Sequence, residues 1–180
     1  MQITHDIIKA LNPCSNRFEN FTLNYPNFIG DAANFLGLEN ITYEDKIWVM
    51  TRLLTKKENA KWGVKCAYSV LPIFEKEYPS DKRPRELLEF ISAIKDFEHI
   101  SSEDLSKLNK LQDATDATVA DGTASYAAAT CAAAGAATYA AASAAYSAAS
   151  YAADAADVCA PAKKIQQDLN LKLLLEVLCG

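Results

Sequence analysis

The chain has 180 residues, half of them hydrophobic, and its 23 acidic and 18 basic residues give a formal net charge of −5 at pH 7. A chain of this length suits one domain and can bury a substantial core. The acidic excess argues against a nucleic-acid-binding surface and permits a basic protein partner. Residues 1–11 lack the basic and apolar segments of a secretory signal, so we expect a cytoplasmic protein.

Helix-start and helix-stop signals divide residues 1–55 into short helices, and no segment shows a convincing β-strand pattern. The predicted helices are residues 4–11, a segment capped by Ser15 and ended by Tyr25-Pro26, residues 32–36, and a helix beginning after Thr42. We therefore expect this N-terminal part to be all-α.

Residues 56–122 are predicted to form a helical pair. Thr55 followed by Glu58 is the signature of a reciprocal N-cap, in which each side chain bonds a free backbone N–H at the start of a helix. Pro72 should kink or interrupt this helix because it removes one hydrogen bond and clashes with the preceding turn. The residues expected on its buried side are Trp62, Val64, Ala67, Val70, Leu71 and Phe74.

The next helix should be capped by Asp81, with Pro84 in its first turn. Ser101, with Asp104 three residues on, should start a further helix that runs toward Asp121-Gly122. The buried side of the helix after Asp81 is expected to carry Leu87, Leu88, Ile91, Ile94 and Phe97.

Residues 123–158 form the most biased segment of the chain. From Ala124 to Ala160, 21 of 37 residues are alanine, and no base occurs between Lys110 and Lys163. Alanine has the highest helix propensity, and its small side chain lets a second backbone approach closely. We therefore expect one long helix at the centre of the fold.

Several non-alanine residues of this segment follow the helical period. Successive spacings of four, three, four and three residues draw one polar stripe, with two tyrosines at its edge. The stripe consists of Ser143, Ser147, Ser150, Asp154 and Asp157, and the tyrosines are Tyr139 and Tyr146. A narrow polar stripe beside a broad small-residue face predicts a helix packed on more than one side.

Three other interpretations of the alanine-rich segment are weaker. Residues 122–153 carry no charge, as in a membrane span, but their many Ser, Thr and Tyr residues would insert poorly into a bilayer. An ice-binding helix needs regularly spaced threonines, and the threonines of this part of the chain follow no fixed period. Disorder is disfavoured because alanine promotes helix and the tyrosines can be buried.

After the alanine-rich segment, Pro161 should bend or restart the chain, and residues 161–180 should form the last helix. This helix is expected to bury Leu169, Leu173, Leu174 and Val177. The predicted fold is thus an all-α, single-domain helical bundle, residues 1–180, built around the long alanine-rich helix.

Groups suited to catalysis are few. His5 and His99 each stand alone, the glycines are scattered, and no Cys or His spacing fits a metal site. We expect no catalytic residue, no metal and no cofactor. The cysteines are odd in number and include no Cys-x-x-Cys pair, so we expect free cysteines that act as small buried hydrophobic residues in a reducing compartment. They are Cys14, Cys66, Cys131, Cys159 and Cys179.

The most specific polar cluster is Asp81-Lys82-Arg83-Pro84-Arg85, at a helix start after an aromatic turn. We favour a structural role, in which Arg83 or Arg85 ties the helix start to a neighbouring carboxylate or to helix C-terminal carbonyls. The alternative is an arginine hot spot that contacts a partner.

These residues also carry a family resemblance. The cluster follows Tyr78-Pro79 and the run Cys66-Ala67-Tyr68-Ser69-Val70-Leu71-Pro72-Ile73-Phe74-Glu75-Lys76. Together with the alanine helix, this combination resembles the bacterial and phage family of alanine-rich helical immunity proteins from toxin–immunity loci. The likeness covers residues 62–180 and is loose over residues 1–54. The resemblance implies a non-catalytic inhibitor that binds a protein, and it does not indicate which residues make the contact.

The first hypothesis is therefore an immunity protein that neutralises a bacterial toxin, or a phage-encoded inhibitor of a host defence nuclease such as an anti-CRISPR. Its expected contact residues are Tyr139, Tyr146, Ser147, Asp154, Asp157, Arg83 and Arg85. The second hypothesis is a structural module that forms a homodimer through the alanine face. An enzyme acting on nucleic acid or nucleotides is the third, although it lacks a recognisable catalytic cluster. No direct contact with nucleic acid or membrane is expected.

Overall fold

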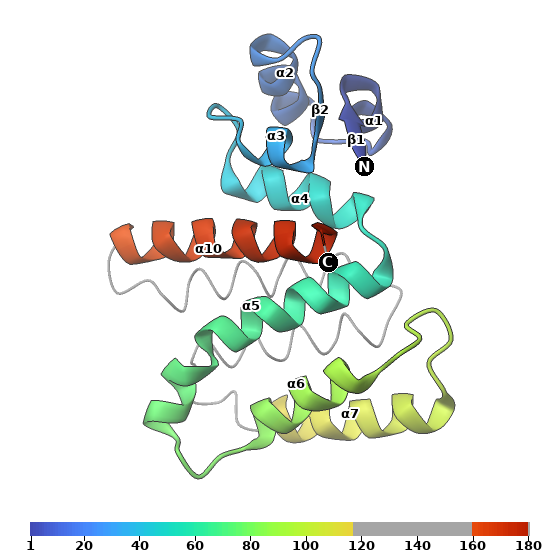
Figure 1. Cartoon of the computed structure of the whole chain (residues 1–180), viewed down its shortest axis with the longest axis vertical. Coiled ribbons are helices and arrows are strands. Elements are labelled where there is room, and N and C mark those ends of the chain that lie inside the picture. Colours follow the sequence, from blue (N-terminus) through green and yellow to red (C-terminus); the bar gives the residue numbers. More distant parts are fainter. Residues whose placement is uncertain (117–159, 180) are drawn as a thin grey trace. The chain divides into compact units, whose positions relative to one another are not determined.

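The computed structural model describes residues 1–116 and 160–179, which are mainly helical (Figure 1). The all-α prediction is confirmed for these residues, apart from one small sheet. The alanine-rich segment lies outside them. The chain divides into two compact units, Met1–Leu53 and Leu54–Gly180, each with its own packing.

The N-terminal unit contains four helices and a two-stranded sheet within its described residues. Its elements are β1 (Gln2–Thr4), α1 (His5–Ala10), α2 (Ser15–Asn24), β2 (Ile29–Asp31), α3 (Ala32–Leu36) and α4 (Tyr43–Leu53). The strands are antiparallel, with Ile3 opposite Gly30. A Cβ at Gly30 would lie 2.8 Å from atoms of Asn34 and Phe28, so only glycine fits this position without rearrangement.

The core of the N-terminal unit is built around Phe21, which is 4% exposed. Five rings surround it with centroids 5.9–6.5 Å away, those of His5, Phe18, Tyr25, Phe28 and Phe35. His5 also lies 3.0 Å from the hydroxyl of Thr22 through its Nε2 atom. His5 therefore serves the packing of this unit, as expected of a histidine with satisfied hydrogen bonds.

Two sequence predictions for this unit are wrong. The prediction of no strand missed β1 and β2, because three-residue strands are too short to show alternation. Ser15 is the first residue of α2, and the N-cap position is held by Cys14, which makes no side-chain capping bond. The expected short helix at residues 32–36 is confirmed, and Asp31 and Asn34 form a reciprocal cap at its start.

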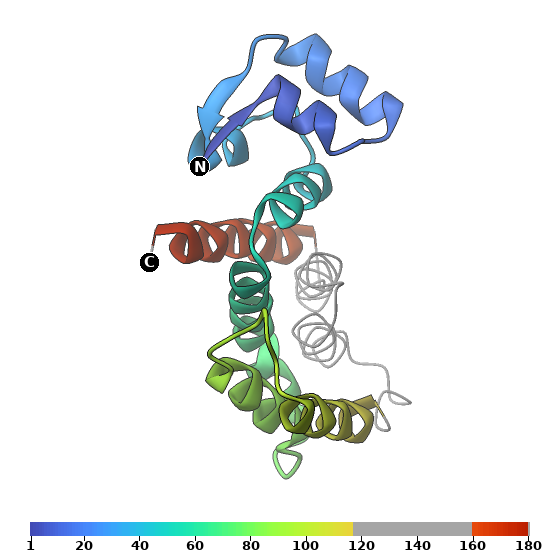
Figure 2. The same cartoon turned by 90° about the vertical axis from the view of Figure 1, so that its right-hand side faces the viewer.

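In the C-terminal unit, the described helices are α5 (Lys56–Glu77), α6 (Arg83–Ala93), α7 (Ser102–Asp116) and α10 (Ala160–Cys179). Helix α5 contacts both α6 and α10, and α6 contacts α7. Figure 2 shows α10 on one side of α5, with α6 and α7 on the other. The predicted reciprocal cap of Thr55 and Glu58 starts α5, and Ser101 accepts a hydrogen bond from the backbone N–H of Asp104 at 3.0 Å to start α7.

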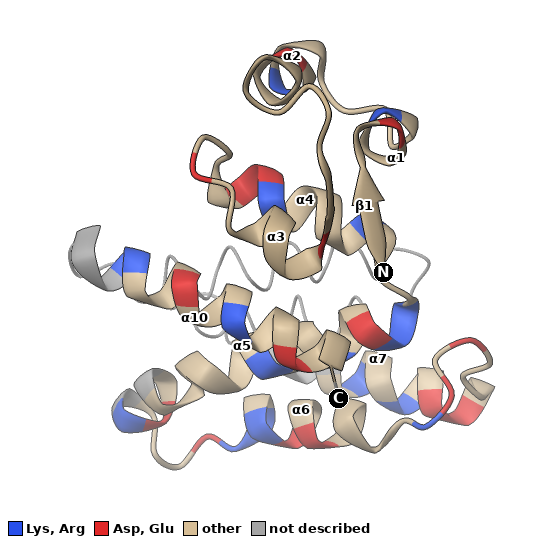
Figure 3. Ribbon diagram, turned by 45° about the horizontal axis from the view of Figure 1, so that its top comes forward, with Lys and Arg blue, Asp and Glu red and all other residues tan. Residues whose placement is uncertain are grey.

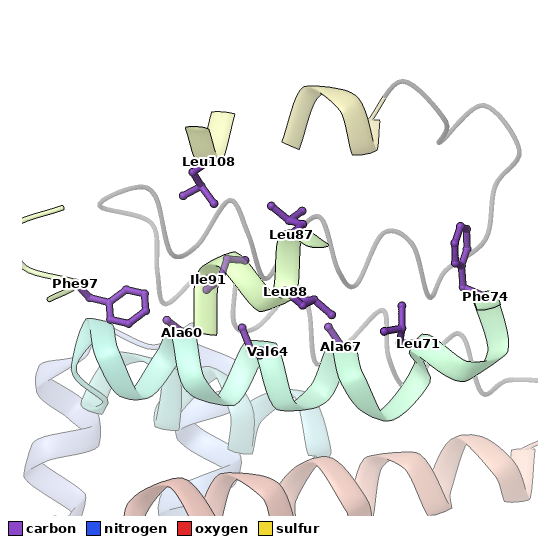
Figure 4. Close-up of a cluster of buried hydrophobic side chains, with 10 residues drawn as sticks. All are labelled: Ala60, Val64, Ala67, Leu71, Phe74, Leu87, Leu88, Ile91, Phe97 and Leu108. Carbon is purple, nitrogen blue, oxygen red and sulfur yellow. The ribbon is translucent and has the colours of Figure 1, made fainter. Parts of the chain in front are cut away.

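One face of α5 packs into an apolar core with α6 and α7 (Figure 4). Leu87, Leu88 and Leu108 are fully buried in this core. The members on α5 recur every three or four residues, as one face of a helix requires. They are Ala60, Val64, Ala67, Leu71 and Phe74. Pro72 does not interrupt α5, and the ribbon in Figure 4 bends beyond Leu71.

A second face of α5 packs on α10 through buried polar groups. The indole Nε1 of Trp62 donates a hydrogen bond to the backbone carbonyl of Asn170 at 2.9 Å. The amide of Gln166 donates to the hydroxyl of Ser69 at 2.8 Å and to the side-chain oxygen of Asn170 at 2.9 Å. Gln166 and Asn170 are 8% and 0% exposed. The register of α10 on α5 is therefore specified by hydrogen bonds.

The structure corrects three details in this unit. The N-cap of α6 is Lys82, although the Asp81 carboxylate still accepts from the first helical N–H, that of Arg83, at 3.1 Å. Helix α6 ends at Ala93, so Phe97 reaches the core from the following connection. In α10 the buried side chains are Gln166, Asn170 and Leu174, whereas Leu169, Leu173 and Val177 are half-buried.

None of the described helices is both long enough and apolar enough to cross a membrane.

We predict that Trp62→Phe lowers the free energy of unfolding by about 1–3 kcal/mol, because it removes a buried hydrogen-bond donor and leaves a small void. Urea denaturation followed by circular dichroism measures this. Lys65→Gln is the control, since it breaks only the exposed pair of Lys65 with Glu176 and should shift the midpoint little. Equal stability of the Trp62 variant and the parent chain would contradict this role of Trp62.

Candidate protein-binding surface

The connection between α5 and α6 places two arginines and Tyr78 at one end of the helix pair. Residues 78–82 form this connection, and the backbone N–H of Asp81 donates to the carbonyl of Tyr78 at 3.1 Å. The rings of Phe74 and Tyr78 stack with centroids 5.1 Å apart. Pro84, at the second position of α6, is buried and presets the first helical turn.

Arg83 is held by the carboxylate of Asp81. Its Nε atom donates to Oδ1 at 2.9 Å and its Nη2 atom to Oδ2 at 2.5 Å. These hydrogen bonds hold the pKa of Asp81 below its usual value. The Asp81 carboxylate thus serves both the backbone and the side chain of one residue, which fixes the start of α6.

Arg85 crosses from α6 to α5 and forms a two-pronged ion pair with Glu75. Its Nε and Nη2 atoms donate to the two Glu75 oxygens, each at 2.7 Å. The hydrogen bonds from Arg85 lower the pKa of Glu75. The structural role predicted for these arginines, tying the helix start to carboxylates, is confirmed by both pairs.

Tyr68 lies seven residues before Glu75 on α5, and its phenol forms a hydrogen bond with Ser92 near the end of α6. Partial burial raises the pKa of this phenol, and the negative charge of Glu89 raises it further, against the opposing effects of the hydrogen bond with Ser92 and of Arg85. We call Glu75, Tyr78, Asp81, Arg83 and Arg85 the hairpin-end cluster.

Two side chains of the hairpin-end cluster are held by ion pairs and remain partly exposed. The side chains of Arg83 and Arg85 remain 37% and 41% exposed although both are ion-paired. Because their positions are already fixed, a partner that contacts them need not order them, which lowers the entropy cost of association. Tyr and Arg are also the residue types that most often dominate binding energy at interfaces.

Figure 3 shows both Lys/Arg and Asp/Glu residues on α6 and α7. Neither helix therefore presents charges of a single sign.

The other sequence-predicted contact residues, Tyr139, Tyr146, Ser147, Asp154 and Asp157, fall outside the described residues. The structure therefore brings together only Arg83 and Arg85 from that set. Glu75 was not among the expected contact residues. The spacing of Glu75 and Arg85 across a short connection between antiparallel helices is the signal that pairs them.

The cysteine prediction is correct for one residue and wrong for two. Cys66 is fully buried, and burial raises the pKa of its thiol, so it is a packing residue with little thiolate. Cys14 and Cys179 are exposed free thiols. No group of three or more His, Cys, Asp or Glu residues arranged for a metal ion is found in residues 1–116 and 160–179.

Comparison with known proteins bears on the role of this surface. Residues 50–172 match the family described as "Imm-5 like putative immunity protein". The chain belongs to the Imm-5-like immunity protein family. The matched residues include all of α5, α6 and α7, and with them the hairpin-end cluster. No curated protein and no solved structure matches the chain.

In this Imm-5-like protein, the family match begins inside α4 and leaves out nearly all of the N-terminal unit. The hairpin-end cluster is therefore part of the family domain. The predicted resemblance is confirmed, and its extent differs at both ends from the expected residues 62–180.

Glu75→Gln should destabilise the Imm-5-like protein at neutral pH, because it replaces a paired carboxylate by an amide. The lowered pKa of Glu75 means that its stabilising contribution is complete above the ordinary value of 4.5 and disappears as pH falls through the folded-state pKa. The difference between parent and variant should therefore shrink in acid. Urea midpoints at pH 7 and pH 3.5 measure it, with the exposed Glu39→Gln as control. A difference that is unchanged in acid would contradict this account.

Proposed function

We propose that this protein is a non-catalytic inhibitor that binds a partner protein and neutralises it, as an immunity protein does with a bacterial toxin. The family match over residues 50–172 is the observation that carries the proposal. It supports a protein as the partner, since an immunity protein acts by occupying its target.

The structure supports a binding role through the hairpin-end cluster. Arg83 and Arg85 are partly exposed and held by carboxylates, and Tyr78 lies on the connection that precedes them. A rigid cluster of aromatic and guanidinium groups offers a partner both apolar area and directed hydrogen bonds. We therefore propose Arg83 and Arg85 as contact residues.

The polar stripe of the alanine-rich segment remains a second proposed contact surface. Tyr139, Tyr146, Ser147, Asp154 and Asp157 add tyrosines and negative charge to a segment without a base. An acidic surface would attract a basic target such as a nuclease and speed their association. The proposed cellular location is the cytoplasm, where such a target would be met.

The experiment is co-expression of the full chain with the product of the adjacent gene, followed by growth measurement and co-purification. We expect the chain to restore growth and to co-purify with that product. If the adjacent product is not toxic, or is toxic and unaffected, the immunity proposal fails for that pair. Inhibition of a host defence nuclease by the purified chain would instead favour the phage-encoded alternative.

The contact residues are tested in the same assay with Tyr146→Ala combined with Asp154→Lys, and separately with Arg85→Glu. Each change should weaken binding by at least about tenfold if its surface is central, because hot-spot truncations commonly cost this much. Glu19→Lys is the control for the Asp154→Lys change, since it makes the same acid-to-base reversal at an exposed position outside the family match. Unchanged binding by a variant would remove its surface from the proposal.

A further inference from the structure

A pocket lies where α6 passes into α7, away from the hairpin-end cluster. Its volume is about 360 Å³, which is within the range of small-ligand sites. The lining comes from the last turn of α6, the connection and the first turn of α7. The lining residues used below are Phe90, Ile94, Ile100, Asp96, His99 and Asp104.

The walls of the pocket are mainly apolar. Phe90, Ile94 and Ile100 are half-buried and pack against the core formed by α5, α6 and α7, so the walls are supported from behind. Lys107 places its ammonium 4.6 Å from the centroid of the Phe90 ring. The aromatic wall therefore already stabilises a cation of the protein itself by a cation–π contact.

Two carboxylates complete the pocket. Asp96 Oδ1 accepts from the backbone N–H groups of Glu98 and His99 at 2.9 and 3.2 Å, and these bonds hold its pKa low. Its Oδ2 atom lies 3.2 Å from Nδ1 of His99. Asp104 Oδ2 accepts from the hydroxyl of Ser101 at 2.8 Å. Both carboxylates are positioned by local hydrogen bonds and keep lone pairs for a further donor.

Acids outnumber bases around the pocket. Residues 94–107 contain four acids, Asp96, Glu98, Glu103 and Asp104, against two lysines, Lys95, which also lines the pocket, and Lys107. Glu98 is paired with Lys56 at 2.9 Å, whereas Asp96 and Asp104 line the pocket. Glu103 and Asp104, in the first turn of α7, also offset the positive end of its dipole.

We infer that this pocket receives an arginine or lysine side chain of the partner protein. The apolar walls suit the methylene stem of such a side chain, and Asp96 and Asp104 suit its charged tip. The inference rests on the proposed function only for the source of the side chain, a partner protein. It adds a second contact site to the hairpin-end cluster within the same family domain.

The test uses the purified full chain and N-acetyl-L-arginine amide as the probe, followed by ¹H–¹⁵N NMR. We expect saturable shifts that centre on residues 90–104, with millimolar affinity, as is usual for one small fragment. N-acetyl-L-norleucine amide has an apolar side chain without the cation, and it should produce markedly smaller shifts. Linear shifts spread over the surface, or equal binding of the two probes, would overturn the inference.

Asp96→Asn and Asp104→Asn supply the matched variants, because each keeps a hydrogen-bond acceptor and removes only the charge. Each should weaken binding of the arginine probe by about fivefold, and Glu103→Gln, an exposed carboxylate on the same turn that does not line the pocket, should weaken it less than twofold. The NMR spectrum of each variant verifies its fold. If both Asn variants bind like the parent, the carboxylates do not hold the probe and the inference fails.

Growth protection in co-expression separates this inference from the proposed function. Protection that persists in the Asp96→Asn/Asp104→Asn double variant overturns the pocket as a partner contact and leaves the immunity proposal standing. Loss of protection in the double variant, with protection kept by Glu103→Gln, supports both. If the parent chain gives no protection but still binds the arginine probe specifically, the claim that the side chain comes from the partner protein is overturned.

Discussion

Helix α5 is stabilised on two faces by different physical interactions, and the described part of the family domain depends on both. Its apolar face packs against α6 and α7, where burial of Leu87, Leu88 and Leu108 supplies the non-directional part of the stability. Its other face meets α10 through Trp62, Ser69, Gln166 and Asn170, whose hydrogen bonds accept only one register. Apolar packing alone tolerates small shifts of one helix along another, whereas a buried donor without its acceptor is costly. The same helix is therefore both the source of core stability and the reference for the position of α10.

The two candidate contact sites are built at opposite ends of α6 by the same kind of device. At its start, Asp81 and Glu75 hold Arg83 and Arg85, and beyond its end the Asp96 carboxylate holds the backbone of residues 98 and 99. In each case a carboxylate is fixed by hydrogen bonds and its pKa is lowered, so the charge is present and in place before a partner arrives. One end presents guanidinium groups paired with carboxylates, and the other presents carboxylates bonded to backbone and hydroxyl groups. A partner that spans α6 would therefore meet different hydrogen-bonding groups at its two ends.

The sequence was sufficient to predict features that depend on residues only a few positions apart. Thr55 with Glu58 and Ser101 with Asp104 were predictable because capping chemistry acts over three or four residues. The short helix at residues 32–36 was predictable because Gly30 and Gly37 mark turns on either side of it. The two strands were not predictable, since Ile3 and Gly30 pair across 27 residues and each strand has only three. The polar contact of α10 was missed for a related reason: Gln166 and Asn170 look like surface residues until Trp62 and Ser69, about 100 positions away, are placed beside them. For the candidate sites, the sequence predicted that Arg83 or Arg85 would pair with a carboxylate, but not which one. The pocket was not predictable, because it depends on where α6 ends and on how Phe97 packs into the core from the following connection.

The cap of α5 has a consequence for how the N-terminal unit can change. Thr55 and Glu58, which complete the first turn of α5, both lie inside the C-terminal unit, one and four residues after its first residue, Leu54. The start of the long helix thus needs no side chain from the preceding residues. Genetic exchange at the boundary between residues 53 and 54 could replace residues 1–53 with an unrelated segment without removing that cap. The family match begins at residue 50, close to this boundary. Diversification of the leading segment is therefore compatible with preservation of the domain that follows it.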